Sequence, residues 1–321
     1  MLYLGLESSC YETAVAIVED GRKIIAHRLI SQTEVHSKFG GVVPEVAARR
    51  HLEVINDLVQ QVFDEAKIDP RSLAGIACTT GPGLIGTLLV GLSCAKALAW
   101  TYDVPLLSVD HIFAHVCANY IDTALEPPFV ALVVSGGHTQ IMHFQSYRKA
   151  TIVGQTLDDA SGEAYDKVAR LLGLGYPGGP AVDKVAAGGN PKAFRFPEGV
   201  VSGSDFSFSG LKTAVLRTVE SHKGAELPVA DLAASFQDAV NRVLFRKTVA
   251  VARAEAVSKI VLAGGVAANS DLRKRFEGLE DIEVFRPAPS LCTDNAVMVA
   301  AAAHYSGEPV PLSVSAYSRQ R

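Results

Sequence analysis

The sequence predicts an α/β protein made of two copies of one mixed-sheet domain that face each other across a central cleft. A pattern of three short strands at residues 3–28 returns without a gap after 126 residues, at 129–153. Each copy continues with a helical stretch, an apolar strand, a glycine turn and a further helix. The alternative is a chance likeness between two hairpins, which the shared order of the later elements disfavours.

The opening strands of each copy show the alternation and the small turns of an antiparallel meander. Ser9 aligns with Ser135 and Thr13 with Thr139, so the turn after the first strand is repeated as well. The expected strands cover residues 3–7, 13–19 and 23–28 in the first copy, and 129–134, 139–145 and 149–153 in the second.

The later elements repeat at a longer spacing. They are helices at 44–66 and 161–172, strands at 74–80 and 259–263, and helices at 84–99 and 266–276. The offset is now about 183 residues, so the second copy carries an insertion of roughly 57 residues, which we place within 175–235. We expect one domain at 1–108, completed by a C-terminal helix within 295–321, and a second domain at 109–294.

Composition limits the class of protein. Hydrophobic residues make up 48% and charged residues 20%, with a net charge of −4, so a packed core is expected and bulk attraction to nucleic acid is not. Five cysteines without C-x-x-C spacing disfavour both a disulfide framework and a cysteine zinc site. No signal peptide is evident, and Gly86, Gly91 and Lys96 interrupt the longest apolar run, so we expect a cytoplasmic protein without a membrane span.

Four small turns follow apolar strands and predict a phosphate-bearing ligand. They lie at residues 8–10, 81–83, 135–137 and 264–265. Backbone N–H groups at such turns approach an anion closely, and a following helix adds its positive N-terminus. Any one of them alone is only a turn, and none matches a P-loop. Together they favour a nucleotide in the cleft.

A metal site is the second chemical hypothesis. His111 and His115 are four residues apart, which places them on one face of a helix, and Asp294 stands at the start of a small-residue helix. Two imidazoles and one carboxylate suit iron(II), zinc or manganese with open positions. The alternatives are two partly buried structural histidines and an Asp294 that simply caps its helix. Ile112 stands where H-E-x-x-H peptidases have their glutamate base, so a metallopeptidase is disfavoured.

These residues resemble the bacterial TsaD family of tRNA threonylcarbamoyladenosine synthases, formerly labelled O-sialoglycoprotein endopeptidases. The resemblance implies the duplicated fold of actin, Hsp70, the sugar kinases and the ribonuclease H-like proteins. It covers essentially the whole chain through ESSCYET (7–13), GPG (81–83), HxxxH (111–115), VSGGHT (134–139), EAYDK (163–167), YPGGP (176–180), GGVAAN (264–269) and CTDN (292–295).

The resemblance also implies a reaction. A threonylcarbamoyl group would move from threonylcarbamoyl-AMP to the exocyclic amine of the adenosine 3′ of the anticodon, in tRNAs that read codons starting with A. The cleft would hold an adenine nucleotide, either the adenylate or ATP/ADP. The partners would be tRNA, a TsaB-type paralogue, a TsaE-type ATPase and a separate synthase that supplies the adenylate.

Site residues follow from the resemblance position by position. The metal ligands would be His111, His115 and Asp294, with Fe(2+) expected and zinc as the alternative. The substrate-binding positions would be Val134, Ser135, Gly136, Gly137 and His138 for the carbamoyl and phosphate end, and Asp166, Gly179, Asp183 and Asn269 for the nucleoside. Glu12 and His138 occupy equivalent positions in the two repeats and are our hypothesis for proton handling in catalysis.

Two other functions remain compatible with the fold class. A kinase or ATPase of the same fold would use Mg²⁺ on carboxylates and phosphate, and would not need His111 and His115. A nucleotide-binding scaffold without catalysis would not need them either. Rapid release of phosphate from ATP by the protein alone would favour the kinase or ATPase.

Overall fold

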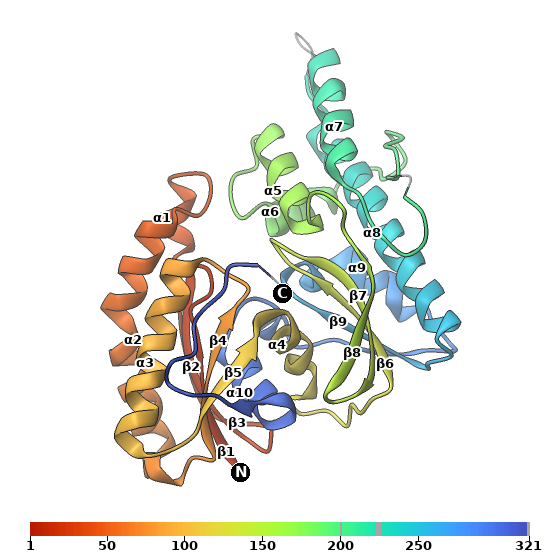
Figure 1. The fold of residues 1–321 in the computed structure, drawn as a ribbon. Coiled ribbons are helices and arrows are strands. Elements are labelled where there is room, and N and C mark those ends of the chain that lie inside the picture. Colours follow the sequence, from red (N-terminus) through yellow and green to blue (C-terminus); the bar gives the residue numbers. More distant parts are fainter. Residues whose placement is uncertain (200, 223–225, 320–321) are drawn as a thin grey trace. The chain divides into compact units, whose positions relative to one another are not determined.

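The computed structural model describes residues 1–199, 201–222 and 226–319, and the chain forms two compact units (Figure 1). Unit 1 combines Met1–Leu125 with Pro287–Arg321, and unit 2 is Glu126–Arg286. The sequence analysis placed the divisions after residues 108 and 294. In the structure the first division follows Leu125 and the second follows Arg286. The reason is that helix α4 (His111–Cys117) packs against α10 (Ala296–Ser306), and both belong to unit 1.

Unit 1 is built on a mixed sheet with strand order β11-β5-β4-β1-β2-β3. Strands β1, β2 and β3 form an antiparallel meander, and β4 and β5 continue the sheet in parallel from β1. The strands are β1 (Leu2–Glu7), β2 (Glu12–Glu19), β3 (Lys23–Ser31), β4 (Gly75–Gly81), β5 (Leu106–Asp110) and β11 (Glu308–Pro309).

Helices cover this sheet because its strands carry buried apolar side chains such as Leu4, Leu6 and Ile17. The helices of unit 1 besides α4 and α10 are α1 (Thr33–Ser37), α2 (Pro44–Ala66) and α3 (Ile85–Tyr102), with short 3-10 turns at Pro70–Ser72, Ala118–Tyr120 and Pro289–Leu291. Helix α10 lies so close to β1 that a side chain at Gly5 would lie 2.5 Å from the carbonyl oxygen of Ala296. Helix α3 is long and apolar enough to cross a membrane by length and composition, but it packs on α2 and β4 as core helices do.

Unit 2 repeats the same architecture, with strand order β10-β9-β6-β7-β8. Its strands are β6 (Phe129–Val134), β7 (Thr139–Ser146), β8 (Lys149–Gln155), β9 (Lys259–Ala263) and β10 (Glu283–Phe285). Its helices are α5 (Ser161–Leu171), α6 (Gly178–Ala186), α7 (Ser209–Ser221), α8 (Val229–Ala254) and α9 (Ser270–Glu277), with a 3-10 turn at Gly265–Ala268. Helix α8 packs on β6 and β9, and buried apolar side chains of all three elements belong to the core of the unit.

Strand register confirms the duplication. In the first hairpin Leu6 pairs with Val15, and in the second hairpin Leu132 pairs with Ile141, so both strands shift by the same 126 residues. A register shared on both strands is not expected from a chance likeness, because a slip of one residue would turn every side chain to the other face. The two mixed-sheet α/β domains predicted from the sequence are therefore confirmed.

The insertion in the second copy is also visible in the pairing. Ile76 of β4 and Ile260 of β9 take the same place beside the first strand of each copy, a shift of 184 residues. Helices α6 and α7 lie within the range 175–235 that was expected to hold the added chain, of which residues 200 and 223–225 lie outside the described residues. The expected C-terminal helix is α10, which ends at Ser306; a short strand and a loop follow it as far as residue 319, and residues 320–321 lie outside the described part.

Candidate functional site

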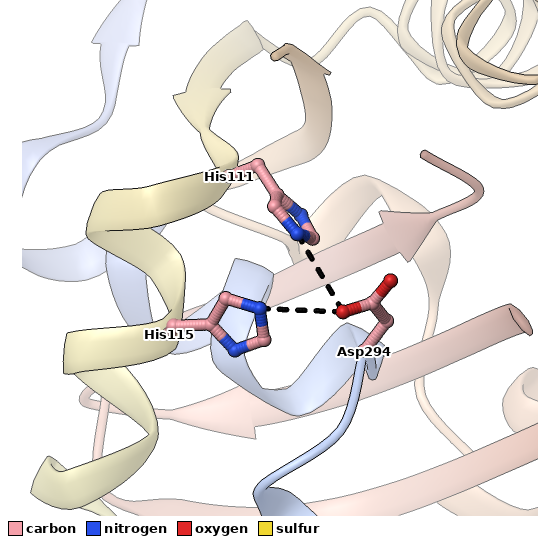
Figure 2. A group of neighbouring side chains, drawn as sticks. All are labelled: His111, His115 and Asp294. Carbon is pink, nitrogen blue, oxygen red and sulfur yellow. Dashed lines mark ion pairs between the residues drawn. The ribbon is translucent and has the colours of Figure 1, made fainter. Parts of the chain in front are cut away.

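Two histidines and one aspartate of unit 1 form the centre of the candidate site (Figure 2). His111 and His115 lie one turn apart on α4, and Asp294 lies just before α10. Nε2 of His111 is 3.5 Å, and Nε2 of His115 3.2 Å, from Oδ1 of Asp294. One potential ligand atom from each residue lies within 4.8 Å of the other two. The structure thus brings together the three residues that the sequence analysis grouped as metal ligands.

Two helix caps build this cluster. Asp110, the last residue of β5, accepts hydrogen bonds of 2.9 and 3.0 Å from two backbone N–H groups in the first turn of α4, so the helix begins at His111. Asn295 caps α10 in the same way, over 3.0 Å. Asp294 is therefore not the helix cap of the simpler interpretation, and its carboxylate points toward the histidines instead (Figure 2).

The buried polar atoms of this cluster fit a divalent metal ion. His115 is 1% exposed, and among the described residues neither of its ring nitrogens has a hydrogen-bond partner. Its Nε2 lies near Asp294 without the geometry of a hydrogen bond. An unsatisfied buried polar atom costs about 1–3 kcal/mol, so a ligand that satisfies it is favoured. Two imidazoles and a carboxylate are ordinary ligands of zinc and iron(II).

Glu7 lies behind His111, fully buried at the end of β1. Its Oε2 is 3.4 Å from Nδ1 of His111 and accepts a 2.6 Å hydrogen bond from the hydroxyl of Thr79, while its Oε1 accepts one of 2.6 Å from the backbone N–H of Ser9. Burial lowers the pKa of His111, but the carboxylates of Asp294 and Glu7 outweigh it and raise that pKa to about 9. Burial favours the neutral form of Glu7, yet His111 holds the pKa of this carboxyl below its usual value.

Glu12, one of the two predicted proton-handling residues, begins β2 and is buried. Its Oε1 accepts a 3.1 Å hydrogen bond from the hydroxyl of Ser31. Burial, with a further contribution from the negative charge of Asp294, raises the pKa of Glu12 to about 9. Its counterpart His138 belongs to unit 2, so the two residues come from different units.

The predicted phosphate-binding turn follows Val134, the last residue of β6. The backbone N–H of Ser135 donates to the carbonyl of His138 over 2.8 Å, and the hydroxyl of Ser135 accepts from the backbone N–H of His138 over 3.2 Å. Gly136 and Gly137 at the tip are exposed, and a Cβ atom at either would meet nothing within 4 Å. Their backbone is therefore open to an approaching ligand.

The four residues predicted to hold the nucleoside lie on or next to helices α5, α6 and α9 of unit 2. Asp166 of α5 accepts a 2.7 Å hydrogen bond from the first backbone N–H of α6. Gly179 is the second residue of α6, and Asp183, further along it, accepts from the backbone N–H and the hydroxyl of Ser270 over 3.0 and 2.8 Å. Asn269 precedes Ser270 and caps α9. Burial raises the pKa of Asp166.

Sequence reasoning did not assign a role to two residues near the cluster of His111, His115 and Asp294. The sequence analysis treated Glu7 only as part of a strand and of a motif. A carboxylate at the end of an otherwise apolar strand could have marked it, because a buried charge needs a partner. Tyr317 donates a 2.9 Å hydrogen bond from its hydroxyl to Oδ2 of Asp110. No local pattern in the sequence marks that contact, because it joins segments far apart in the chain.

Solved structures resemble this chain in fold. Full-length HypF in its phosphate- and nucleotide-bound form matches with a TM-score of 0.64 and 14% identity, over 94% of this chain and 46% of HypF. Component A of the (R)-2-hydroxyglutaryl-CoA dehydratase of Acidaminococcus fermentans matches with a TM-score of 0.55 and 16% identity, over 95% of this chain and 98% of that one. At such identities the likeness concerns the fold alone, and it agrees with the predicted duplicated actin-like class.

Sequence comparisons identify the family. The model of the TsaD family, described as tRNA N6-adenosine threonylcarbamoyltransferase, matches residues 23–301. Proteins of that name from Caldicellulosiruptor bescii and Thermotoga neapolitana are 48% and 51% identical to this chain, each over 95% of it and over 93% and 94% of their own length. The chain belongs to the TsaD family of tRNA N6-adenosine threonylcarbamoyltransferases.

Proposed function

We propose that this chain transfers the threonylcarbamoyl group of threonylcarbamoyl-AMP to N6 of the adenosine 3′ of the anticodon, in tRNAs that read codons starting with A. One observation carries the proposal: about half of the residues are identical to those of transferases of that name, over nearly the full length of the chain. The setting is the cytoplasm, in keeping with five free cysteines.

A divalent metal ion, Fe(2+) with zinc as the alternative, is assigned to His111, His115 and Asp294. The buried ring nitrogens of His115 and the position of Asp294 support this assignment. A bound ion would supply a Lewis acid for a carbonyl or phosphoryl oxygen of the substrate.

The adenylate is assigned to unit 2. The turn from Val134 to His138 would hold the carbamoyl and phosphate end, since the backbone of Gly136 and Gly137 is open on the exposed side. Asp166, Gly179, Asp183 and Asn269 would hold the nucleoside. The open space over Gly179, where a Cβ atom would meet nothing within 4 Å, supports that placement. ATP or ADP would bind at the same positions.

The chemistry asks mainly for orientation and charge stabilisation. The adenine amine is a weak nucleophile because its lone pair is delocalised into the ring, so the acyl donor must be activated, as a mixed anhydride with phosphate is. In the transfer a bond forms between N6 and the carbamoyl carbon, the bond from that carbon to the phosphate oxygen breaks, and AMP leaves. N–H donors near the reacting carbonyl would stabilise the developing negative charge. His138 would receive the proton that N6 loses. Glu12 could do so only in its ionised form, because its raised pKa of about 9 keeps the carboxyl protonated near neutral pH.

The partners assigned are tRNA, a TsaB-type paralogue, a TsaE-type ATPase and a separate synthase that makes the adenylate. The net charge of −4 supports a need for other subunits, because a protein of this charge gains little affinity for tRNA from bulk electrostatics. Full turnover with tRNA and adenylate but without any partner would refute this part of the proposal.

The deciding experiment is a transfer assay. Purified chain with its partners receives labelled threonylcarbamoyl-AMP and tRNA, and the wild type is compared with His111→Ala. Label in tRNA with the wild type, and its loss in the variant, is the expected result. If no partner set gives label while the chain binds or hydrolyses ATP, the transferase assignment fails and an ATPase or a nucleotide-binding scaffold takes its place.

A further inference from the structure

We propose that Glu7 is a positioning residue of the metal site, which holds the proton of the His111 ring on Nδ1 and so presents the lone pair of Nε2 to the ion. This inference rests on the proposed metal site. It concerns a carboxylate that is not itself one of the three ligands.

The geometry separates the two ring nitrogens of His111. Nε2 faces Asp294 at 3.5 Å (Figure 2). The other ring nitrogen, Nδ1, is 3.4 Å from Oε2 of Glu7. A carboxylate behind a metal-binding histidine fixes the tautomer and the ring orientation, and makes the ligand more basic. The imidazole of His111 thus lies between two carboxylates with different tasks.

Glu7 is itself held rigidly. It is 0% exposed, and both of its oxygens accept 2.6 Å hydrogen bonds, one from the backbone N–H of Ser9 and one from the hydroxyl of Thr79. These donors fix the carboxylate plane and leave Oε2 facing His111. The hydroxyl oxygen of Ser9 lies 3.2 Å from Nδ1, and with the ring proton on Nδ1 it would be a second acceptor for that proton.

A glutamine at position 7 could not reproduce this pattern. If its NH₂ group faced His111 and Thr79, it would donate to Nδ1 and force the ring proton onto Nε2, where it blocks coordination. If its oxygen faced His111, the NH₂ group would meet the backbone N–H of Ser9, and two donors would oppose each other. Only the carboxylate accepts on both sides.

Loss of the Glu7 carboxylate should therefore weaken metal binding by His111 and leave binding by His115 unchanged. His111 has a carboxylate behind it, whereas Nδ1 of His115 has no hydrogen-bond partner among the described residues. Removal of the Glu7 charge should loosen the ion through His111 alone. The site would keep His115 and Asp294, so its affinity should fall without vanishing.

The first test measures Zn²⁺ affinity by competition with a chelator. Glu7→Gln should bind Zn²⁺ about 10–100-fold more weakly than the wild type, the usual effect of losing such a partner. The matched control is Glu53→Gln, an exposed glutamate on α2 that pairs with Arg50, and its affinity should be unchanged. Equal affinity of Glu7→Gln and the wild type would overturn the inference.

The second test needs no folded variant of Glu7. In the zinc-loaded wild type, nitrogen NMR should show His111 coordinated through Nε2, with a downfield proton on Nδ1; the signals are assigned by their absence in His111→Ala. Coordination through Nδ1 would overturn the role of Glu7 while the metal site stands. If the wild type binds no more Zn²⁺ than His115→Ala, the metal site itself fails, and this inference fails with it.

Discussion

Tyr317 and Asp110 are joined by a 2.9 Å hydrogen bond from the tyrosine hydroxyl to Oδ2 of the aspartate. Asp110 uses its other oxygen to cap α4, the helix that carries both histidines. The backbone N–H of Tyr317 also donates to the carbonyl of Thr80 over 2.9 Å, and Gly81 lies directly under the tyrosine, where a Cβ atom would come within 2.2 Å of the carbonyl oxygen of Tyr317. The C-terminal segment, blue in Figure 1, is thus hydrogen-bonded to the start of α4 within unit 1.

The first prediction concerns this hydrogen bond. Tyr317→Phe removes one hydrogen bond to Asp110 and should lower the free energy of unfolding by about 1 kcal/mol, as measured by urea denaturation. Tyr102→Phe is the matched control, because among the described residues the hydroxyl of Tyr102 makes no hydrogen bond, while its ring packs against Phe63 and the core of unit 1. Equal effects of the two substitutions would show that the hydroxyl of Tyr317 contributes nothing.

The second prediction concerns the ion. Zn²⁺ or Fe²⁺ at about 100 times its dissociation constant should raise the free energy of unfolding of the wild type by about 2.7 kcal/mol, because it binds the folded chain. A chelator should reverse the gain. His115→Ala and Asp294→Asn should show little of it, whereas His222→Ala in unit 2 should retain it. Stabilisation that persists in His115→Ala would place the ion elsewhere.

The third prediction concerns pH. His51 is buried, with Nδ1 at 2.7 Å from the hydroxyl of Thr13 and Nε2 at 3.1 Å from the carbonyl of Cys10. Burial lowers the pKa of His51, so below its usual value of 6.5 the unfolded chain binds a proton that the folded chain does not. Stability contributed by neutral His51 is therefore present above pH 6.5 and is lost as the pH falls toward the lower folded pKa.

The measurement is urea denaturation at pH 7 and pH 5.5. Stability should decrease less between these two values in His51→Gln than in the wild type, because one of the groups that binds a proton only on unfolding is gone. His27, His36 and His304, whose pKa values are also lowered, keep part of the slope in both proteins. An unchanged pH dependence in His51→Gln would contradict the prediction.

Local patterns in the sequence were sufficient for most of the fold. Strand alternation and the gap-free repeat predicted both hairpins, and the register of Leu6 with Val15 and of Leu132 with Ile141 confirms them. The four-residue spacing of His111 and His115 predicted one helical face, since a helix repeats every 3.6 residues. These features depend on neighbours in the chain, which the sequence displays directly.

Contacts between distant segments were harder to predict. Asp294 was grouped with the histidines only because it stands at the start of a small-residue helix, with a helix cap as the alternative. The structure adds the physical reason for the contact, which is that Asn295 takes the capping position and frees Asp294. The contact of Glu7 with His111 depends on a parallel pairing of β1 with β4, and β4 with β5, that no local pattern encodes. The domain boundary was misplaced for the same kind of reason, because the packing of α4 on α10 joins residues far apart in the chain. The cleft between the units stays a prediction.

The fourth prediction separates ligand contact from folding at Gly179. A Cβ atom there would meet no protein atom within 4 Å, and alanine is favoured over glycine in a helix, so Gly179→Ala should fold at least as stably as the wild type. If the nucleoside lies against this residue, the added methyl group should weaken binding of ADP or the adenylate about tenfold or more, as measured by calorimetry. Gly210→Ala on α7, which is equally open, is the control and should bind normally.

Gly178→Ala is not a clean probe, because its Cβ would lie 2.5 Å from Cα of Asp166 and would disturb the fold itself. Normal nucleotide binding by Gly179→Ala would therefore move the nucleoside away from α6, since no loss of stability could account for the result.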